Sequence, residues 1–168
     1  MRLLALNDVL VHQISDLISA EVQLVAAMPR LAQAVWTSGL RDAFDEHLEE
    51  TRGHVARLEH AAARLGMPGA GHDSRTMQAL ILDCDEIVSS AADPVTRDVA
   101  LIGAARRIEH YELAAYGTAR ELARQLDMDE VPGLLDQTLD EESAADARLT
   151  RIAAGGLLTG GVNARAAQ

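Results

Sequence analysis

The chain has 168 residues, enough for one domain with a substantial buried core. Apolar residues make up 48% of it but aromatic residues only 2%, and this Ala- and Leu-rich composition favours closely packed helices over sheets. A formal net charge of -11 argues against a nucleic-acid groove and against docking on an anionic membrane, because both need a cationic surface.

The cysteine content and the absence of targeting signals indicate the compartment. Cys84 is the single cysteine, which excludes an internal disulfide and fits a reducing cytoplasm, and its apolar context ALILDCDEIV predicts a buried thiol. The N-terminal stretch MRLLALNDVLVHQ lacks a signal-peptide cleavage site, and no segment approaches the roughly 18 uncharged apolar residues of a membrane span. We therefore expect a soluble, cytoplasmic protein with no nucleic-acid or membrane partner.

The first two predicted helices are long and consecutive. Asn7 or Asp8 can cap a helix that runs until Ser38 and Gly39 interrupt it. A second helix is expected over 40–65, before the loop GMPGAGHD. The short connection between them predicts an antiparallel hairpin.

The third and fourth helices have clear N-terminal signals. Ser74 opens a shorter helix over 74–91. Asp93 followed by Pro94 is a strong start, because proline is tolerated in the first turn of a helix. That fourth helix is expected to continue to about residue 126.

The last predicted helix opens with Asp129 and Pro132 and ends near residue 154. Four of the five helices are long, roughly 40 to 50 Å at 1.5 Å per residue, and helices of this length pack as bundles. We predict an all-α four-helix bundle of two antiparallel helix hairpins with an additional crossover helix. The bundle domain spans 1–154, and the glycine-rich segment 155–168 is expected to be a flexible C-terminal tail.

The inward stripe of each long helix is apolar at both ends and polar near its middle. At spacings of three and four residues the first helix is interrupted by a single glutamate, whereas the short third helix has no such break. The interrupting acidic and imidazole side chains are Glu21, His47, Glu50, His54, Glu109, Glu112, Glu142 and Asp146. These side chains are predicted to meet at one level of the core.

Several buried carboxylates at one level of the core need positive charge to compensate them. Burying an ionised carboxylate costs several kcal/mol, and no Lys or Arg lies on the stripes at that level. Carboxylate and imidazole ligands suit Fe or Mn, and bundles bind such pairs with glutamates and Glu–His pairs. The sequence predicts two divalent metal ions, with iron preferred and manganese possible, bound by Glu21, Glu50, His54, Glu109, Glu112, Glu142 and Asp146.

Some positions leave alternatives open. Glu141 replaces Glu142 as the inward residue if the helix phase is shifted by one. His47 either binds metal or orients Glu50 from outside. The side chain of Asp146 is short, so it either binds directly or reaches a metal only through water.

Three further positions also have a purely structural interpretation. Glu50 and Glu109 can rotate to the rim of the bundle, and His54 can be a core histidine hydrogen-bonded to a carboxylate. Tyr116 lies on the stripe of the fourth helix, where its hydroxyl either packs or donates a hydrogen bond to a ligand carboxylate.

A family resemblance is carried by the strings SAEVQLVAAMPRLAQA, AFDEHLEETRGHVARLE, DVALIGAARRIEHYELAAYGTARELA and LLDQTLDEESAADARLT. They resemble the YciF/YciE bacterial stress proteins of the ferritin-like, rubrerythrin-related superfamily, over about residues 7–153. The resemblance implies a ferritin-like bundle, usually dimeric, with a di-iron centre and a role in stress responses. The superfamily pattern places carboxylates at Glu21, Glu50, Glu109 or Glu112, and Glu142.

The chain departs from that pattern in two places. Di-iron members of the superfamily usually carry Glu-x-x-His on the second and last helices. Here Gly53 and Ala145 occupy the expected histidine positions, with His54 and Asp146 one residue later. Both displaced residues still face the same way, at a spacing of four, so the resemblance implies a carboxylate-rich site with unusual geometry.

Two function classes follow from this pattern. One is a di-iron or di-manganese oxidoreductase with redox, ferroxidase or peroxide chemistry. The other is a non-catalytic dimeric stress or scaffold protein whose metal site is vestigial. A cage-forming storage protein ranks third, because it needs a defined assembly.

Overall fold

Five long or medium helices account for most of the chain in the computed structural model, which describes residues 3–67, 73–156 and 159–167. Two very short strands and one short helix follow them. The elements are α1 (Leu6–Ala34), α2 (Ser38–Arg64), α3 (Arg75–Ser89), α4 (Pro94–Gln125), α5 (Val131–Ala154), β1 (Gly155–Gly156), β2 (Thr159–Gly160) and α6 (Val162–Ala166).

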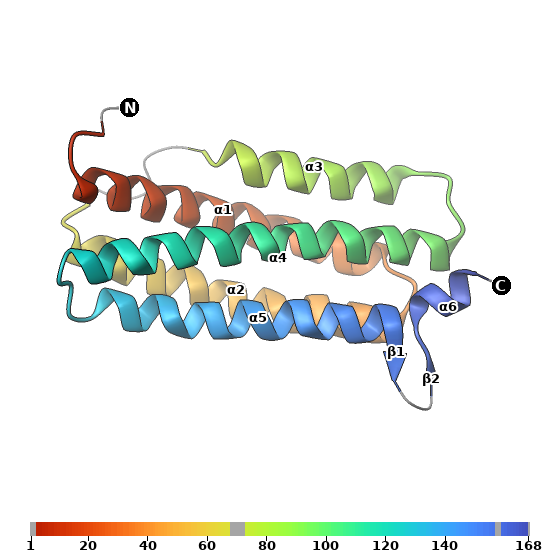
Figure 1. Cartoon of the computed structure of the whole chain (residues 1–168). Helices are drawn as coiled ribbons and strands as arrows, with labels where there is room; N and C mark the ends of the chain where they lie inside the picture. The colour runs from red at the N-terminus through yellow and green to blue at the C-terminus, as the bar shows by residue number, and fades with distance from the viewer. Residues whose placement is uncertain (1–2, 68–72, 157–158, 168) are drawn as a thin grey trace.

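The four long helices form the predicted bundle. Helices α1 and α2 pack as one hairpin and α4 and α5 as the other, with α1 against α4 and α2 against α5 (Figure 1). Helix α3 lies outside the square along α1 and α4, within the crossover between the hairpins. The all-α bundle with a crossover helix is therefore confirmed.

Two helix starts are capped as the sequence predicts. The Ser74 hydroxyl accepts a hydrogen bond from the backbone N–H of Met77 at 3.4 Å. The Asp93 carboxylate accepts from the N–H groups of Val95 and Thr96 at 3.1 and 3.0 Å. Each cap satisfies donors that the first turn of a helix leaves without partners.

The bend between α1 and α2 lies earlier than predicted. Ser38 and Gly39 begin α2 instead of separating it from α1. The bend is held by Asp98 of α4, whose carboxylate accepts from the backbone N–H groups of Trp36 and Thr37 at 3.0 and 2.7 Å. A residue about 60 positions away thus sets this boundary.

Two hydrophobic clusters fill the bundle on either side of a polar layer. The first cluster includes Leu24, Met28, Leu31, Phe44, Leu101, Ile108 and Leu149. The second includes Leu10, Ile14, Leu17, Leu58, Ala119 and Leu135. Cys84, predicted as a buried thiol, is 1% exposed within the first cluster.

The segment after α5 differs from the predicted tail. Strands β1 and β2 pair antiparallel, and α6 contacts α4 and α5 (Figure 1). Val162 of α6 is 3% exposed and belongs to the first cluster. The core therefore includes a residue beyond the predicted boundary at 154, while the flexibility of the segment stays a prediction.

Helix α1 is the most apolar of the described long helices. Among the described helices it alone is long and apolar enough to cross a membrane, with an 18-residue window of mean hydropathy 1.2. Half of that window is buried inside the bundle, where α1 contacts α2, α3 and α4. A helix that is apolar in composition and buried in this way is ordinary for the core of a bundle.

Candidate metal centre

Six ionisable side chains occupy the layer between the two hydrophobic clusters. Four are glutamates from three helices, and two are histidines from α2. The layer consists of Glu21 (0% exposed), Glu109 (3%), Glu112 (0%), Glu142 (0%), His47 (7%) and His54 (0%). Of the adjacent pair Glu141 and Glu142, it is Glu142 that points inward.

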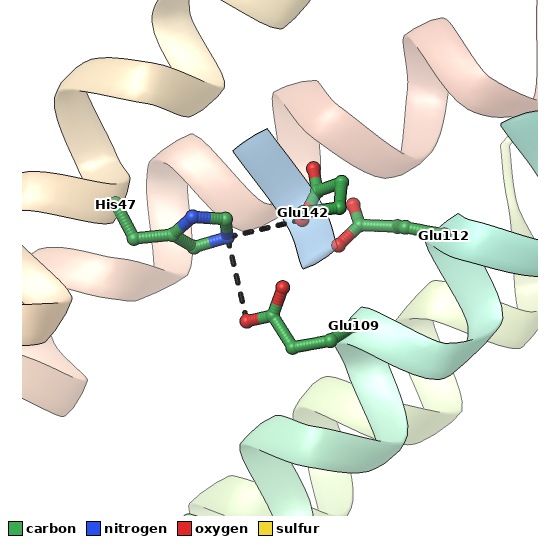
Figure 2. A group of neighbouring side chains, drawn as sticks. All are labelled: His47, Glu109, Glu112 and Glu142. Carbon is green, nitrogen blue, oxygen red and sulfur yellow. Dashed lines mark ion pairs between the residues drawn. The ribbon is translucent and has the colours of Figure 1, made fainter. Parts of the chain in front are cut away.

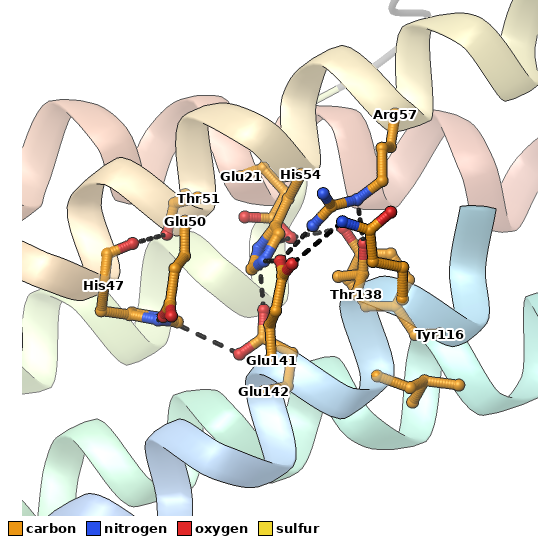
Figure 3. A network of polar contacts seen from close by, with 12 residues as sticks. Glu21, His47, Glu50, Thr51, His54, Arg57, Tyr116, Thr138, Glu141 and Glu142 are labelled. Atoms are coloured by element: carbon orange, nitrogen blue, oxygen red, sulfur yellow. Dashed lines mark hydrogen bonds and ion pairs between the residues drawn. The ribbon is translucent and has the colours of Figure 1, made fainter.

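A first group joins α1, α2 and α5 (Figure 3). The Nδ1 atom of His54 lies 3.4 Å from Glu21 Oε1 and 2.9 Å from Glu142 Oε1. One potential ligand atom from each residue lies within 4.8 Å of the others. The Tyr116 hydroxyl donates a short hydrogen bond of 2.5 Å to Glu21 Oε1, so of the two roles that the sequence left open for Tyr116 the structure shows the hydrogen bond to a core carboxylate.

A second group shares Glu142 with the first, and Figure 2 shows its side chains. The Nε2 atom of His47 is 3.5 Å from Glu109 Oε1 and 3.8 Å from Glu142 Oε2. Glu112 completes this group, with ligand atoms again within 4.8 Å of one another. Glu142 therefore belongs to both groups and offers a different oxygen to each histidine.

Most of the inward-facing atoms have no hydrogen-bond partner among the described residues. Although His54 Nδ1 and Glu142 Oε1 are only 2.9 Å apart, they are not aligned as a hydrogen bond. The unpartnered buried atoms of the two groups are Glu21 Oε2, His47 Nε2, His54 Nδ1, Glu109 Oε2, both oxygens of Glu112 and both oxygens of Glu142. Leaving such atoms unpaired in a core is costly, and all of them have lone pairs that a cation can use.

The outer nitrogen of His54 is held in place. Its Nε2 atom lies 3.0 Å from Glu141 Oε2, and Arg57 pairs with the same carboxylate (Figure 3). Arg57 also donates from Nε to Thr138 Oγ1 at 2.9 Å. A carboxylate on the far nitrogen is the usual support of a metal-binding histidine, because it fixes the ring and the tautomer.

His47 has a similar but weaker support. Its Nδ1 atom lies 3.4 Å from Glu50 Oε2, and the Glu50 side chain is 33% exposed. The structure thus places Glu50 on the rim, outside both groups. His47, whose role the sequence left open, takes the inward position.

Asp146 is a second predicted ligand that lies outside both groups. It belongs to neither group, and its carboxylate accepts from Arg106 Nε at 2.7 Å and lies 3.4 Å from His110 Nε2. The arginine comes from the facing helix α4 and attracts the side chain toward the surface. This corrects the expectation of an inward Asp146.

The electrostatics of the layer oppose full ionisation. Burial raises the pKa of Glu109 and Glu112 well above the ordinary value, and the charge of Glu142 adds to the effect. Burial also raises the pKa of Glu21. Without cations, protons are needed to offset most of this charge.

His54 and Glu142 behave as an ion pair. Burial alone lowers the pKa of His54, but close contact with Glu142 and Glu21 outweighs it and raises that pKa to about 10. Burial alone raises the pKa of Glu142, but contact with His54 and the charge of His47 lower it. The imidazolium of His54 thus compensates the charge of Glu142 in the absence of metal.

Two divalent cations fit the donor set. The four buried glutamates carry four negative charges when ionised, and two divalent ions carry four positive charges with both histidines neutral. Carboxylate oxygen and imidazole nitrogen are ligands for Fe and Mn. The residues that the structure brings together therefore match a dinuclear centre in charge and in chemistry.

Comparisons with known proteins agree with this architecture. The family model described as a domain of unknown function, DUF892, matches residues 5–167. Over 154 residues the chain is 39% identical to Protein YciF of Escherichia coli (strain K12). The aligned region covers 91% of this chain and 93% of that protein. The crystal structure of the E. coli stress protein YciF matches with a TM-score of 0.85 and covers 88% of this chain and 94% of that one.

Two further solved structures extend the comparison. YcfI of Rhodopseudomonas palustris, described as a candidate structural protein, is 32% identical, with a TM-score of 0.85 and coverage of 89% and 95% of the two chains. A protein of Xanthomonas campestris, 19% identical, has a TM-score of 0.67 over 87% and 88% of the two chains. At that identity the likeness shows the fold alone.

Proposed function

The chain belongs to the family described as a domain of unknown function, DUF892, and we propose that it binds two divalent metal ions, iron or manganese, in the polar layer of its bundle. One observation carries this proposal. Eight buried oxygen and nitrogen atoms face one another in that layer without hydrogen-bond partners among the described residues.

The two groups divide the ligands between the ions. Glu21, His54 and Glu142 would hold the first ion. The second would be held by His47, Glu109, Glu112 and Glu142. Because each oxygen of Glu142 faces a different histidine, Glu142 would help to hold both ions.

The metal pair would supply redox chemistry toward oxygen or peroxide, since carboxylate ligands stabilise the higher oxidation state. The protein itself positions the ligands. Tyr116 orients the Glu21 carboxylate, and Glu141 and Glu50 orient the rings of His54 and His47. Close packing of the second hydrophobic cluster covers the layer on one side.

Metal analysis tests the proposal. After anaerobic loading with ferrous iron and removal of excess metal, we expect two Fe per chain. Glu121 is an exposed glutamate on the same helix as Glu112, so Glu121→Gln is a matched control that should keep both ions. A wild-type chain that stays metal-free under these conditions, with Mn as well as with Fe, contradicts the proposal.

A non-catalytic structural role is the second candidate. The description of YcfI as a candidate structural protein favours it, as does the ion pair that His54 and Glu142 can form without metal. Glu21→Ala distinguishes the two functions. A metal site loses ions on this change, whereas an empty acidic core becomes more stable once a buried carboxylate is removed.

We further propose a cytoplasmic homodimer that acts in stress responses. The support is the 39% identity to YciF, whose crystal structure is described as that of a stress protein. Light scattering on the purified chain tests the assembly. A mass equal to one chain, or to a large cage, contradicts the dimer.

A further inference from the structure

A cavity of about 400 Å³ lies inside the bundle next to the second metal group. Most of its wall is apolar and comes from all five of the larger helices. The apolar wall includes Leu24, Met28, Phe44, Cys84, Leu101 and Ile108. A volume of about 300 to 1,000 Å³ is typical of sites that bind small molecules, so this cavity suits a small ligand.

One side of the cavity reaches the metal layer. His47, Glu50 and Glu109 are part of its lining, and two of them belong to the second group. The apolar space therefore ends at side chains proposed to hold a metal ion. A molecule inside it would lie beside that ion without entering the polar layer.

The mouth of the cavity lies between α2 and α5 and carries side chains of both charges. Its charged lining residues that reach solvent are Glu46, Glu50, Arg148 and Arg151. Arg148 forms an ion pair with Glu46 across the opening. Arg151 has no ion-pair partner among the described residues, which leaves one cation at the mouth of an otherwise acidic protein.

We propose that this cavity binds an amphiphile with one anionic head, of the class of medium-chain carboxylic acids. The hydrocarbon chain fills the apolar space and the carboxylate lies at the mouth, near Arg148 and Arg151. Burying an anionic head at the inner end, away from water, is costly, so the chain enters with its apolar end first. The metal layer at that inner end rests on the proposed function, but binding itself needs no metal.

Calorimetric titration of the metal-free protein with decanoate tests the site. We expect saturable binding of one decanoate per chain. Arg151→Gln should weaken decanoate binding about three- to fivefold, the scale of an exposed ion pair, and leave decanol binding unchanged. Arg75→Gln, an exposed arginine on α3 away from the cavity, is the matched control. Absence of saturable binding, or an equal effect of both arginine substitutions, overturns the proposal.

Filling the cavity should abolish binding of both probes. Ala105 lines the cavity and is 8% exposed, so Ala105→Leu places a larger apolar side chain in the empty space. Ala145→Leu does the same from α5, as a second variant should the first fail to fold. Ala114→Leu on the exposed face of α4 is the control. Folded cavity variants that still bind decanoate refute the site.

Manganese then tests the orientation and separates this proposal from the metal site. In protein loaded with Mn²⁺, paramagnetic relaxation should broaden the NMR signal of the terminal methyl group of decanoate more than that of the methylene beside its carboxylate. The reverse order overturns the proposed orientation. A chain that binds decanoate in the titration but takes up neither Mn²⁺ nor Fe²⁺ supports the cavity and refutes the proposed function.

Discussion

Glu142 links the two groups of donors, because one of its oxygens faces His54 and the other faces His47. We predict that Glu142→Gln removes both metal ions, since an amide binds cations poorly. Glu112→Gln should lose only the second ion, because Glu112 belongs to the second group alone. Elemental analysis of the two variants after identical loading checks this. Equal losses in both would show that the two groups do not hold separate ions.

Glu141 offers a second prediction at the residue scale. Its side chain is 27% exposed, and it holds His54 from outside the layer. Glu141→Ala should fold normally but bind metal about 10- to 100-fold more weakly, the usual effect of removing a support from a histidine ligand. Competition with a fluorescent chelator measures the affinity. Asp140→Ala, one residue away and exposed, should bind as tightly as the wild type, and an equal loss there would exclude a specific role for Glu141.

Individual side chains also show where sequence reasoning ends. The helical stripe predicts which turn faces the core, and Glu21, Glu112, Glu142 and His54 are all buried as expected. The stripe of one helix does not show which charged side chains the neighbouring helix places opposite it. Arg106 on α4 pairs with Asp146 on α5, and no pattern within α5 reveals that partner.

His47 and Glu50 illustrate a related limit. They lie three residues apart on α2, so both satisfy the same stripe. The structure places the ring inside and the carboxylate on the rim, where water solvates its charge. A lone carboxylate loses more by burial than a neutral imidazole does, and that comparison is the signal that would have favoured His47.

Helix boundaries could be predicted where a local cap decides them. Ser74 and Asp93 cap their own first turns, so the starts of α3 and α4 follow from neighbouring residues alone. The bend before α2 depends on Asp98, which is distant in the sequence. The glycines after α5 predict a flexible tail from the sequence alone. One of them, Gly161, instead permits a close approach between the backbone before α6 and the end of α5.

Gly161 permits that approach and gives a prediction at the element scale. A Cβ atom there would overlap backbone atoms of Ala153, Ala154 and Gly155, so the end of α5 and the start of α6 have no room for a side chain. We predict that Gly161→Ala displaces α6, exposes Val162 and lowers the free energy of unfolding by about 1 to 3 kcal/mol. Urea denaturation measures the change.

Gly103 provides the control for this substitution. It is exposed within α4, and a Cβ atom there would meet nothing within 4 Å. Gly103→Ala should raise the free energy of unfolding by about 0.5 to 1 kcal/mol, because alanine is the better helix former. If Gly161→Ala were equally stabilising, the packing of α6 against the bundle in solution would be refuted.

The bundle as a whole consists of two stabilising hydrophobic clusters separated by a layer that opposes folding when it is ionised. Groups whose pKa is raised by folding contribute stability at low pH and lose it as pH rises through the folded pKa. Glu109 and Glu112 are such groups, because folding raises their pKa above the ordinary pKa of 4.5 for a glutamate. The pKa of His54 is raised from 6.5 to about 10, so His54 also stabilises the protein less as pH rises through that range.

Metal should reverse this dependence, because ligands bind cations in their deprotonated forms. We predict that the metal-free chain loses stability from the layer as pH rises above 4.5, while the stabilisation by Mn²⁺ grows over the same range. At a free metal concentration about 100 times the dissociation constant, each ion adds about 2.7 kcal/mol. Urea denaturation at several pH values above 4.5, with and without Mn²⁺, measures the difference in the free energy of unfolding that the metal produces.

Carboxylates outside the layer whose pKa is lowered, such as Glu130 and Asp146, stabilise the protein as pH rises and would mask the effect of the layer in a single curve. Comparison with Glu112→Gln removes them, since both proteins share every surface group. The difference in the free energy of unfolding, wild type minus Glu112→Gln, should fall with rising pH in the absence of metal. In the presence of Mn²⁺ the same difference should rise with pH. A difference that stays flat in both conditions would mean that Glu112 keeps one protonation state throughout and takes no part in binding.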